Sequence, residues 1–86
     1  MRKLIFNDGT EIEGGEAGLA GRQLWLFLPG YTFQQAAEIA LDQNKTAVII
    51  FEYSDELADR YEGYVNCTAI SVDYEQTNVC LEKGES

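Results

Sequence analysis

The side chains most able to do chemistry gather in one stretch of the chain, residues 51–64, which reads FEYSDELADRYEGY. One arginine, Arg60, stands there against five carboxylates: Glu52, Asp55, Glu56, Asp59 and Glu62. Carboxylates can hold a metal ion, transfer protons or bind basic partners. This stretch lacks the alternating acids and the central glycine of a calcium loop, so the spacing of its carboxylates disfavours a cation site.

Catalysis is disfavoured because the sequence lacks the usual catalytic groups. It has no histidine, the commonest general base, and its serines have no evident activating partner. The glycine-rich segment 14–21, GGEAGLAG, lacks the lysine and the strand-to-helix context of a phosphate-binding loop. The sequence therefore predicts a protein that is not an enzyme, with no catalytic residue, cofactor or metal site.

Two interpretations of the acidic stretch remain. In the first, it is a solvated loop that keeps the edge of a hairpin from pairing with other chains. In the second, it binds a protein, because carboxylates about 5 to 7 Å apart can imitate a row of phosphates and compete for the basic residues of a nucleic-acid channel. Tyr53, Tyr61 and Tyr64 flank the acids and are candidate aromatic anchors, although positions in a core or on a sheet face explain such tyrosines equally well.

Composition limits the partners and the location. The 86 residues are enough for a single domain, 1–86, and the net charge of −9 disfavours direct binding to nucleic acid or anionic membranes and favours a basic protein partner. The residues before Asn7 are too few for a signal peptide or a membrane span, so we expect a cytoplasmic protein. Cys67 and Cys80 are then expected to be reduced and buried, with a disulfide or a metal role as the alternative.

Local signals predict the elements of the N-terminal half. Asp8-Gly9 between two short alternating runs predicts a β-hairpin, and four glycines in residues 14–21 predict a loop. A capping box of Thr32 and Gln35, followed by apolar residues at helical spacing, predicts a helix from Phe33 to Asp42.

Residues 22–30 between that loop and the helix read as a strand with five consecutive apolar residues, Leu24 to Leu28. A strand that is apolar on both faces has either both faces covered by its own domain or one face open to a partner. The helix and a curled sheet can cover both faces. The alternative is a homodimer or a docking patch around Trp25 and Phe27.

The C-terminal half reads as strands at 46–54, 60–74 and 77–84. The apolar parity of the second changes near residues 68–70, which predicts a β-bulge there. The acidic stretch becomes a hairpin tip at 54–59, although acids at steps of three and four residues also fit a short helix. Either geometry gathers the acids on one side. The predicted fold is α+β, with the order βββαβββ and a single helix packed on a bent antiparallel sheet or a partly closed barrel.

Several segments together resemble a family of small proteins encoded in prophages of gut bacteria, often near tail and lysis genes: FNDGTEIE, LWLFLPGYTFQQAAEIALDQNKT, YEGY and VCLEK. The resemblance covers nearly the whole chain and transfers no functional residue. It implies either an anti-CRISPR-like inhibitor that occludes a host defence nuclease by DNA mimicry, or a virion or tail-assembly accessory protein.

We predict the inhibitor, a monomer when free, with the acidic hairpin and its tyrosines as the binding surface. Reversal of Asp55, Glu56 and Asp59 to lysine is then expected to abolish binding while the fold survives. The accessory protein would instead oligomerise through its sheet at Trp25 and Phe27, and its oligomer would be indifferent to those reversals.

Overall fold

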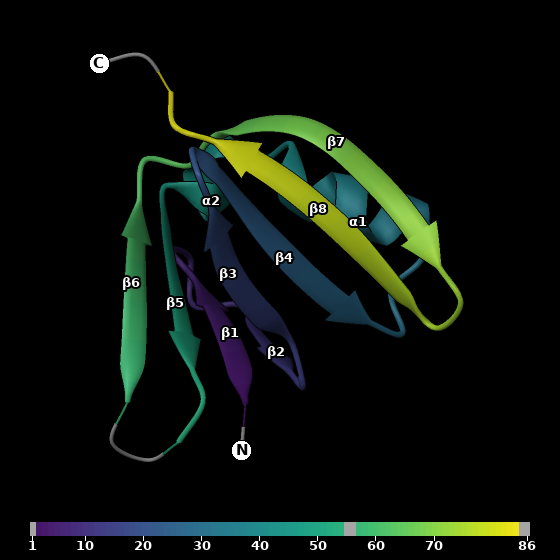
Figure 1. The fold of residues 1–86 in the computed structure, drawn as a ribbon, viewed down its shortest axis with the longest axis horizontal. Helices are drawn as coiled ribbons and strands as arrows, with labels where there is room; N and C mark the ends of the chain where they lie inside the picture. Colours follow the sequence, from purple (N-terminus) through teal and green to yellow (C-terminus); the bar gives the residue numbers. More distant parts are fainter. Residues whose placement is uncertain (1, 55–56, 85–86) are drawn as a thin grey trace.

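The computed structural model of the chain describes residues 2–54 and 57–84. Two helices, α1 and α2, lie near the middle of the described chain, and the other elements are strands. Figure 1 shows their arrangement. In chain order the elements are β1 (Lys3–Phe6), β2 (Glu11–Glu13), β3 (Glu16–Ala20), β4 (Gln23–Pro29), α1 (Phe33–Ala40), α2 (Gln43–Thr46), β5 (Val48–Glu52), β6 (Ala58–Glu62), β7 (Asn66–Asp73) and β8 (Gln76–Glu82).

The strands form two antiparallel sheets of four. The first sheet has the order β2-β1-β5-β6 and the second has the order β3-β4-β8-β7. In Figure 1 the first sheet lies on the left, the second lies on the right, and α1 lies behind β7 and β8, which it contacts. The short helix α2 contacts α1 and β5. The predicted α+β class with antiparallel strands is therefore confirmed.

The predicted order and sheet are wrong. Among the described residues, four strands precede the helices and four follow them, and two separate sheets replace the single bent sheet or partly closed barrel. One added strand, β3, lies inside the glycine-rich segment that was predicted as a loop. Gly14 makes the turn before it at a φ of 78°, and Ala17 then points into the core. The strand is held by its antiparallel pairing with β4, which no local signal in the glycine-rich segment reveals.

The other added strand comes from the segment 60–74. Gly63, with a φ of 81°, breaks this segment into β6 and β7, which belong to different sheets. Its amide donates to the carbonyl of Ala47 at 3.0 Å, and its carbonyl accepts from the amide of Gly84 at 2.9 Å. The predicted bulge is confirmed, since the register of β7 against β8 shifts between Cys67 and Ala69.

The predicted helix is present and slightly shorter. Both hydrogen bonds of the capping box form between Thr32 and Gln35, at 3.0 and 3.1 Å, and the helix ends at Ala40 rather than Asp42. Asp42 instead caps α2, where its side chain accepts from the amides of Asn44 and Lys45. The prediction of a single helix is therefore wrong, because α2 is a second one. The sequence did not predict α2, since four residues are too short to show a periodic apolar pattern.

A single core joins both sheets and α1. The central strand β4 alternates, so that Leu24, Leu26 and Leu28 are buried while Trp25 and Phe27 lie half-buried on the opposite face. From the first sheet the core takes Leu4, Phe6, Ile49 and Phe51, and from α1 it takes Ala36, Ile39 and Ala40. The small alanines let α1 approach the second sheet closely.

Candidate protein-binding surfaces

The acidic stretch lies on a β-hairpin. Residues 48–52 of β5 pair with residues 58–62 of β6, which confirms the hairpin over the short helix for the described part of the stretch. Tyr53 donates its amide to the carbonyl of Leu57 at 3.4 Å, at the start of the connection. Asp55 and Glu56 lie outside the described residues, so their part in the predicted surface stays a prediction.

The described acids of this hairpin do not share one face. Strand pairing places Glu52 opposite Ala58, and Glu62 opposite Val48, on the outer face of the first sheet. Asp59 lies opposite the buried Phe51, and therefore on the inner face. The prediction that the acids gather on one side is wrong for these three, because successive side chains of a strand point to opposite faces.

A larger acidic surface appears on the outer face of the first sheet. Because β1 pairs with both β2 and β5, Lys3 lies between Glu13 and Glu52, and Ile5 lies between Glu11 and Ile50. We call this surface the acidic face and define it by four glutamates from three strands: Glu11, Glu13, Glu52 and Glu62.

The centre of the acidic face is apolar. Its central residues, Ile5, Val48 and Ile50, lie on the same face of the sheet as the four glutamates and are half-buried. An apolar strip flanked by charges resembles the composition of a protein interface, in which a desolvated centre is surrounded by a polar rim.

The bases of the acidic face are already engaged. Nζ of Lys3 lies 3.1 Å from Glu11 and 3.5 Å from Glu52, and Nε of Arg60 lies 2.7 Å from Glu62. The hydrogen bond to Glu11 and the charges of both glutamates raise the pKa of Lys3. Four carboxylates against two bases leave the face with an excess of negative charge.

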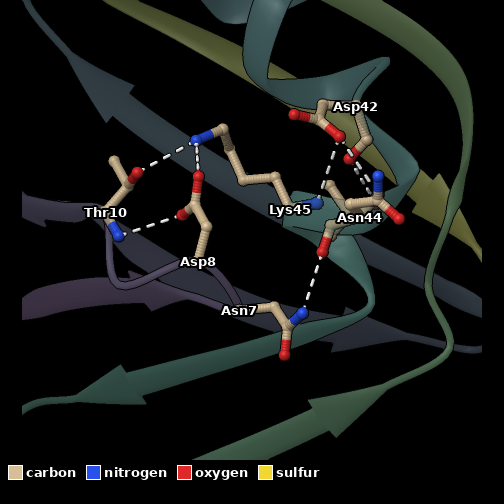
Figure 2. Close-up of polar contacts among 7 residues, drawn as sticks. Asn7, Asp8, Thr10, Asp42, Asn44 and Lys45 are labelled. Atoms are coloured by element: carbon tan, nitrogen blue, oxygen red, sulfur yellow. Dashed lines mark hydrogen bonds and ion pairs between the residues drawn. The ribbon is translucent and has the colours of Figure 1, made fainter.

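A polar cluster fixes the β1–β2 hairpin, which carries Glu11 and Glu13, against α2. Figure 2 shows Nζ of Lys45 reaching a carboxylate oxygen of Asp8 and, at 2.9 Å, the hydroxyl of Thr10. The side-chain amide of Asn7 donates to the carbonyl of Asn44 at 3.0 Å. The hydrogen bonds from Lys45 and Thr10 lower the pKa of Asp8 to about 2.

The three tyrosines lie away from the acidic face. Tyr64 is buried in the core, and Tyr61 packs against the core with its ring edge-on to that of Tyr64, at 6.2 Å between centroids. Burial and the charge of Asp59 raise the pKa of Tyr61. Tyr53 is more exposed, with its ring 5.0 Å from that of Phe51. Two of the three are thus core or sheet-face residues, and a binding role for them stays a prediction.

The aromatic residues of β4 define a second surface. Trp25 lies opposite Cys80 on β8 and Gly18 on β3, and Phe27 lies opposite Asn78 and Glu16, on the outer face of the second sheet. Both rings are half-buried, and the Cys80 thiol beside them is buried and free.

Cys67 is the other free thiol, and burial raises its pKa. It lies opposite Leu81 and packs against the core, away from the outer face on which Cys80 lies.

Sequence reasoning missed Glu11 and Glu13 as surface candidates. Their alternation around the buried Ile12 does place both on one face, and this local signal was present in the segment TEIEG. It could not join them to Glu52, because that requires the pairing of β1 with β5 across more than forty residues of chain.

Within residues 2–54 and 57–84, no three side chains of the metal-binding types are grouped so that they could hold an ion. Neither described helix has the length and apolar character needed to cross a membrane. The chain matches no protein-family model, and no curated protein or solved structure is significantly similar to it. A proposal of function must therefore rest on the chain's own geometry and charge.

Proposed function

We propose that the chain is a small acidic inhibitor that binds a basic protein and covers its nucleic-acid-binding surface. The observation that carries the proposal is the acidic face, where four glutamates from three strands of one sheet flank an apolar strip and both bases are already paired. The partner we propose is a host defence nuclease of the CRISPR type, met in the cytoplasm of the host cell, in keeping with the resemblance to prophage proteins.

The mechanism needs only charge on a rigid support. Glu11 and Glu13 are alternate residues of β2, about 7 Å apart, and Glu13 and Glu52 face each other across β1 at two strand spacings, about 10 Å, so these glutamates form a fixed array on the scale of neighbouring phosphates. Lysines and arginines of a nucleic-acid channel would pair with this array as they pair with a DNA backbone. Ile5, Val48 and Ile50 would add apolar contact at the centre, since the pairing of β1 with β5 holds them in place.

The charge of the whole chain supports the same partner. A net charge of −9 steers the protein toward basic surfaces at long range and makes association faster at low salt. Binding of this kind weakens as salt rises, because salt screens the attraction between the surfaces.

The test is cleavage of DNA by a panel of guide-loaded CRISPR nucleases, with the protein added before or after the DNA, at low and high salt. We expect inhibition of at least one nuclease when the protein is added first, and weaker inhibition when DNA is added first or salt is raised. A double variant, Glu13→Lys with Glu62→Lys, should relieve the inhibition.

The matched control is Glu38→Lys with Glu82→Lys, which changes the net charge equally but places the new lysines on α1 and β8. It should inhibit nearly as well as the wild-type protein. Equal loss in both double variants would mean that only total charge matters, and a panel without any inhibited nuclease would remove the proposed target.

A second candidate function is a phage virion or tail-assembly accessory protein that oligomerises through its second sheet. The observation that favours it is the pair of half-buried rings, Trp25 and Phe27, on the outer face of that sheet. This candidate predicts a stable oligomer that does not depend on the acidic face.

A further inference from the structure

A separate groove lies between the β4–α1 connection and the tip of the β7–β8 hairpin. It is open to solvent and has a volume of about 1060 Å³, and its lining includes four apolar or aromatic residues and two acids: Pro29, Tyr31, Val72, Tyr74, Asp73 and Glu75. None of these residues belongs to the acidic face. The volume is comparable with that of sites which take small ligands or a few side chains of a peptide.

Tyr74 is the residue that the fold does not explain. Its side chain is fully exposed, and its backbone has a φ of 49°, in the left-handed region where glycine and asparagine are usual. A glycine or asparagine would make this two-residue turn with less strain and without exposing an aromatic ring. Because stability does not favour a tyrosine here, its ring points to an interaction.

The walls of the groove are held in place by hydrogen bonds. The amide of Gly30 donates to the carbonyl of Glu75 at 2.8 Å, which ties the β4–α1 connection to the hairpin tip. The hydroxyl of the buried Thr77 donates to the carbonyl of Tyr31 at 2.5 Å, which ties this lining residue to β8. A groove fixed in this way loses little conformational freedom on binding.

The charge of the groove selects its occupant. Asp73 and Glu75 both line it, and no lysine or arginine is found among its described lining residues. At the start of α1, the amide of Gln35 is already bonded to the Thr32 hydroxyl within the capping box, so it is not available to an occupant of the groove. An anionic or purely apolar occupant would therefore leave the two carboxylates uncompensated, whereas a cationic one would pair with them.

We propose that this groove binds an arginine-bearing segment of a partner protein. A guanidinium group can stack flat on a tyrosine ring while its N–H groups donate to a nearby carboxylate, a combination that the compact ammonium group of lysine does not match. Tyr74 supplies the ring, and Asp73 and Glu75 supply the acceptors. The site is independent of the acidic face and of the identity of any nuclease that the acidic face binds.

The experiment is a titration of the isotope-labelled full chain with three short peptides, acetyl-GRGRG-amide, acetyl-GKGKG-amide and acetyl-GEGEG-amide, followed by NMR chemical shifts. We expect saturable shifts at Tyr31, Val72 and Tyr74 with the arginine peptide, binding of the lysine peptide weaker by about two- to fivefold, and no saturable shifts with the glutamate peptide. Shifts spread over the acidic face instead, or equal affinity for arginine and lysine peptides, would overturn the proposal.

The variant Tyr74→Asn tests the role of the tyrosine ring directly, since asparagine accepts a positive φ and the hairpin should stay folded. We expect it to weaken binding of the arginine peptide about two- to fivefold. Leu41→Asn, which removes an exposed apolar side chain at the other end of α1, should bind as the wild type does, and so should the acidic-face double variant. Unchanged affinity in Tyr74→Asn would refute the stacking role, whatever the outcome of the nuclease panel.

Discussion

At the scale of single residues, Asp8 couples the β1–β2 hairpin to α2 through Lys45. Its pKa of about 2 in the folded chain lies below the ordinary value of 3.8, chiefly because of the hydrogen bond from Lys45. A depressed folded pKa means that the stabilising contribution is complete above pH 3.8 and is lost as the pH falls toward 2. We therefore expect this carboxylate to make the stability of the protein fall between pH 4 and pH 2.

Asp8→Asn tests that assignment. Asparagine cannot ionise, so the variant should be less stable than the wild type at pH 6, and the difference between them should shrink as the pH falls from 4 to 2. Urea unfolding at pH 6, 4, 3 and 2 measures it. Glu38→Gln, which removes an exposed carboxylate from α1, is the control. A difference in stability that stays constant between pH 6 and pH 2 would contradict the assignment.

At the scale of elements, the capping box should be the main local determinant of the start of α1. Thr32→Ala removes the oxygen that accepts from the amide of Gln35 and should lower the free energy of unfolding by about 1 kcal/mol. Chemical denaturation measures this loss. Gln34→Ala, at an exposed position of the first turn, should change the stability by less than half as much. A Thr32→Ala variant as stable as the wild type would show that packing of α1 on β7 and β8 alone fixes its start.

The elements that the sequence predicted are those set by local chemistry. Asp8-Gly9 indicates the first hairpin, Thr32 and Gln35 indicate α1, and the change of parity near Thr68 indicates the bulge in β7. The missed features have causes elsewhere in the fold. Strand β3 forms because it pairs with β4, although glycine lowers its strand propensity. The split between β6 and β7 depends on a single glycine that the surrounding strand-like residues obscure.

The candidate site follows the same division. That Glu52 and Glu62 occur on a hairpin was predictable, because two strand-like runs flank a polar connection. Their separation from Asp59 follows from the alternation of a strand once the pairing is known. Glu52 lies on the same face as Glu11 and Glu13 because β1 lies between β2 and β5. No short segment of the sequence predicts this nonlocal pairing. The sequence thus predicted the charge, and the topology determined which face carries it.

At the scale of the whole molecule, net charge and the outer face of the second sheet have opposite effects on self-association. A charge of −9 repels a second copy, whereas the half-buried rings of Trp25 and Phe27 would favour one. Both rings are already half-buried by their neighbours within the chain, which leaves less apolar surface to offer a second copy. We therefore expect repulsion to win and the free protein to be monomeric.

Size-exclusion chromatography with light scattering, at low and at high salt, measures the outcome. A mass near the monomer value of 9.6 kDa at both salt concentrations would fit the inhibitor. A dimer at high salt alone would mean that only repulsion prevents association, since salt screens charge but leaves apolar contact intact. A dimer at both salt concentrations that Trp25→Ser disrupts, and that Glu13→Lys with Glu62→Lys leaves unchanged, would favour the assembly protein, because its contact is the sheet and its charge is incidental.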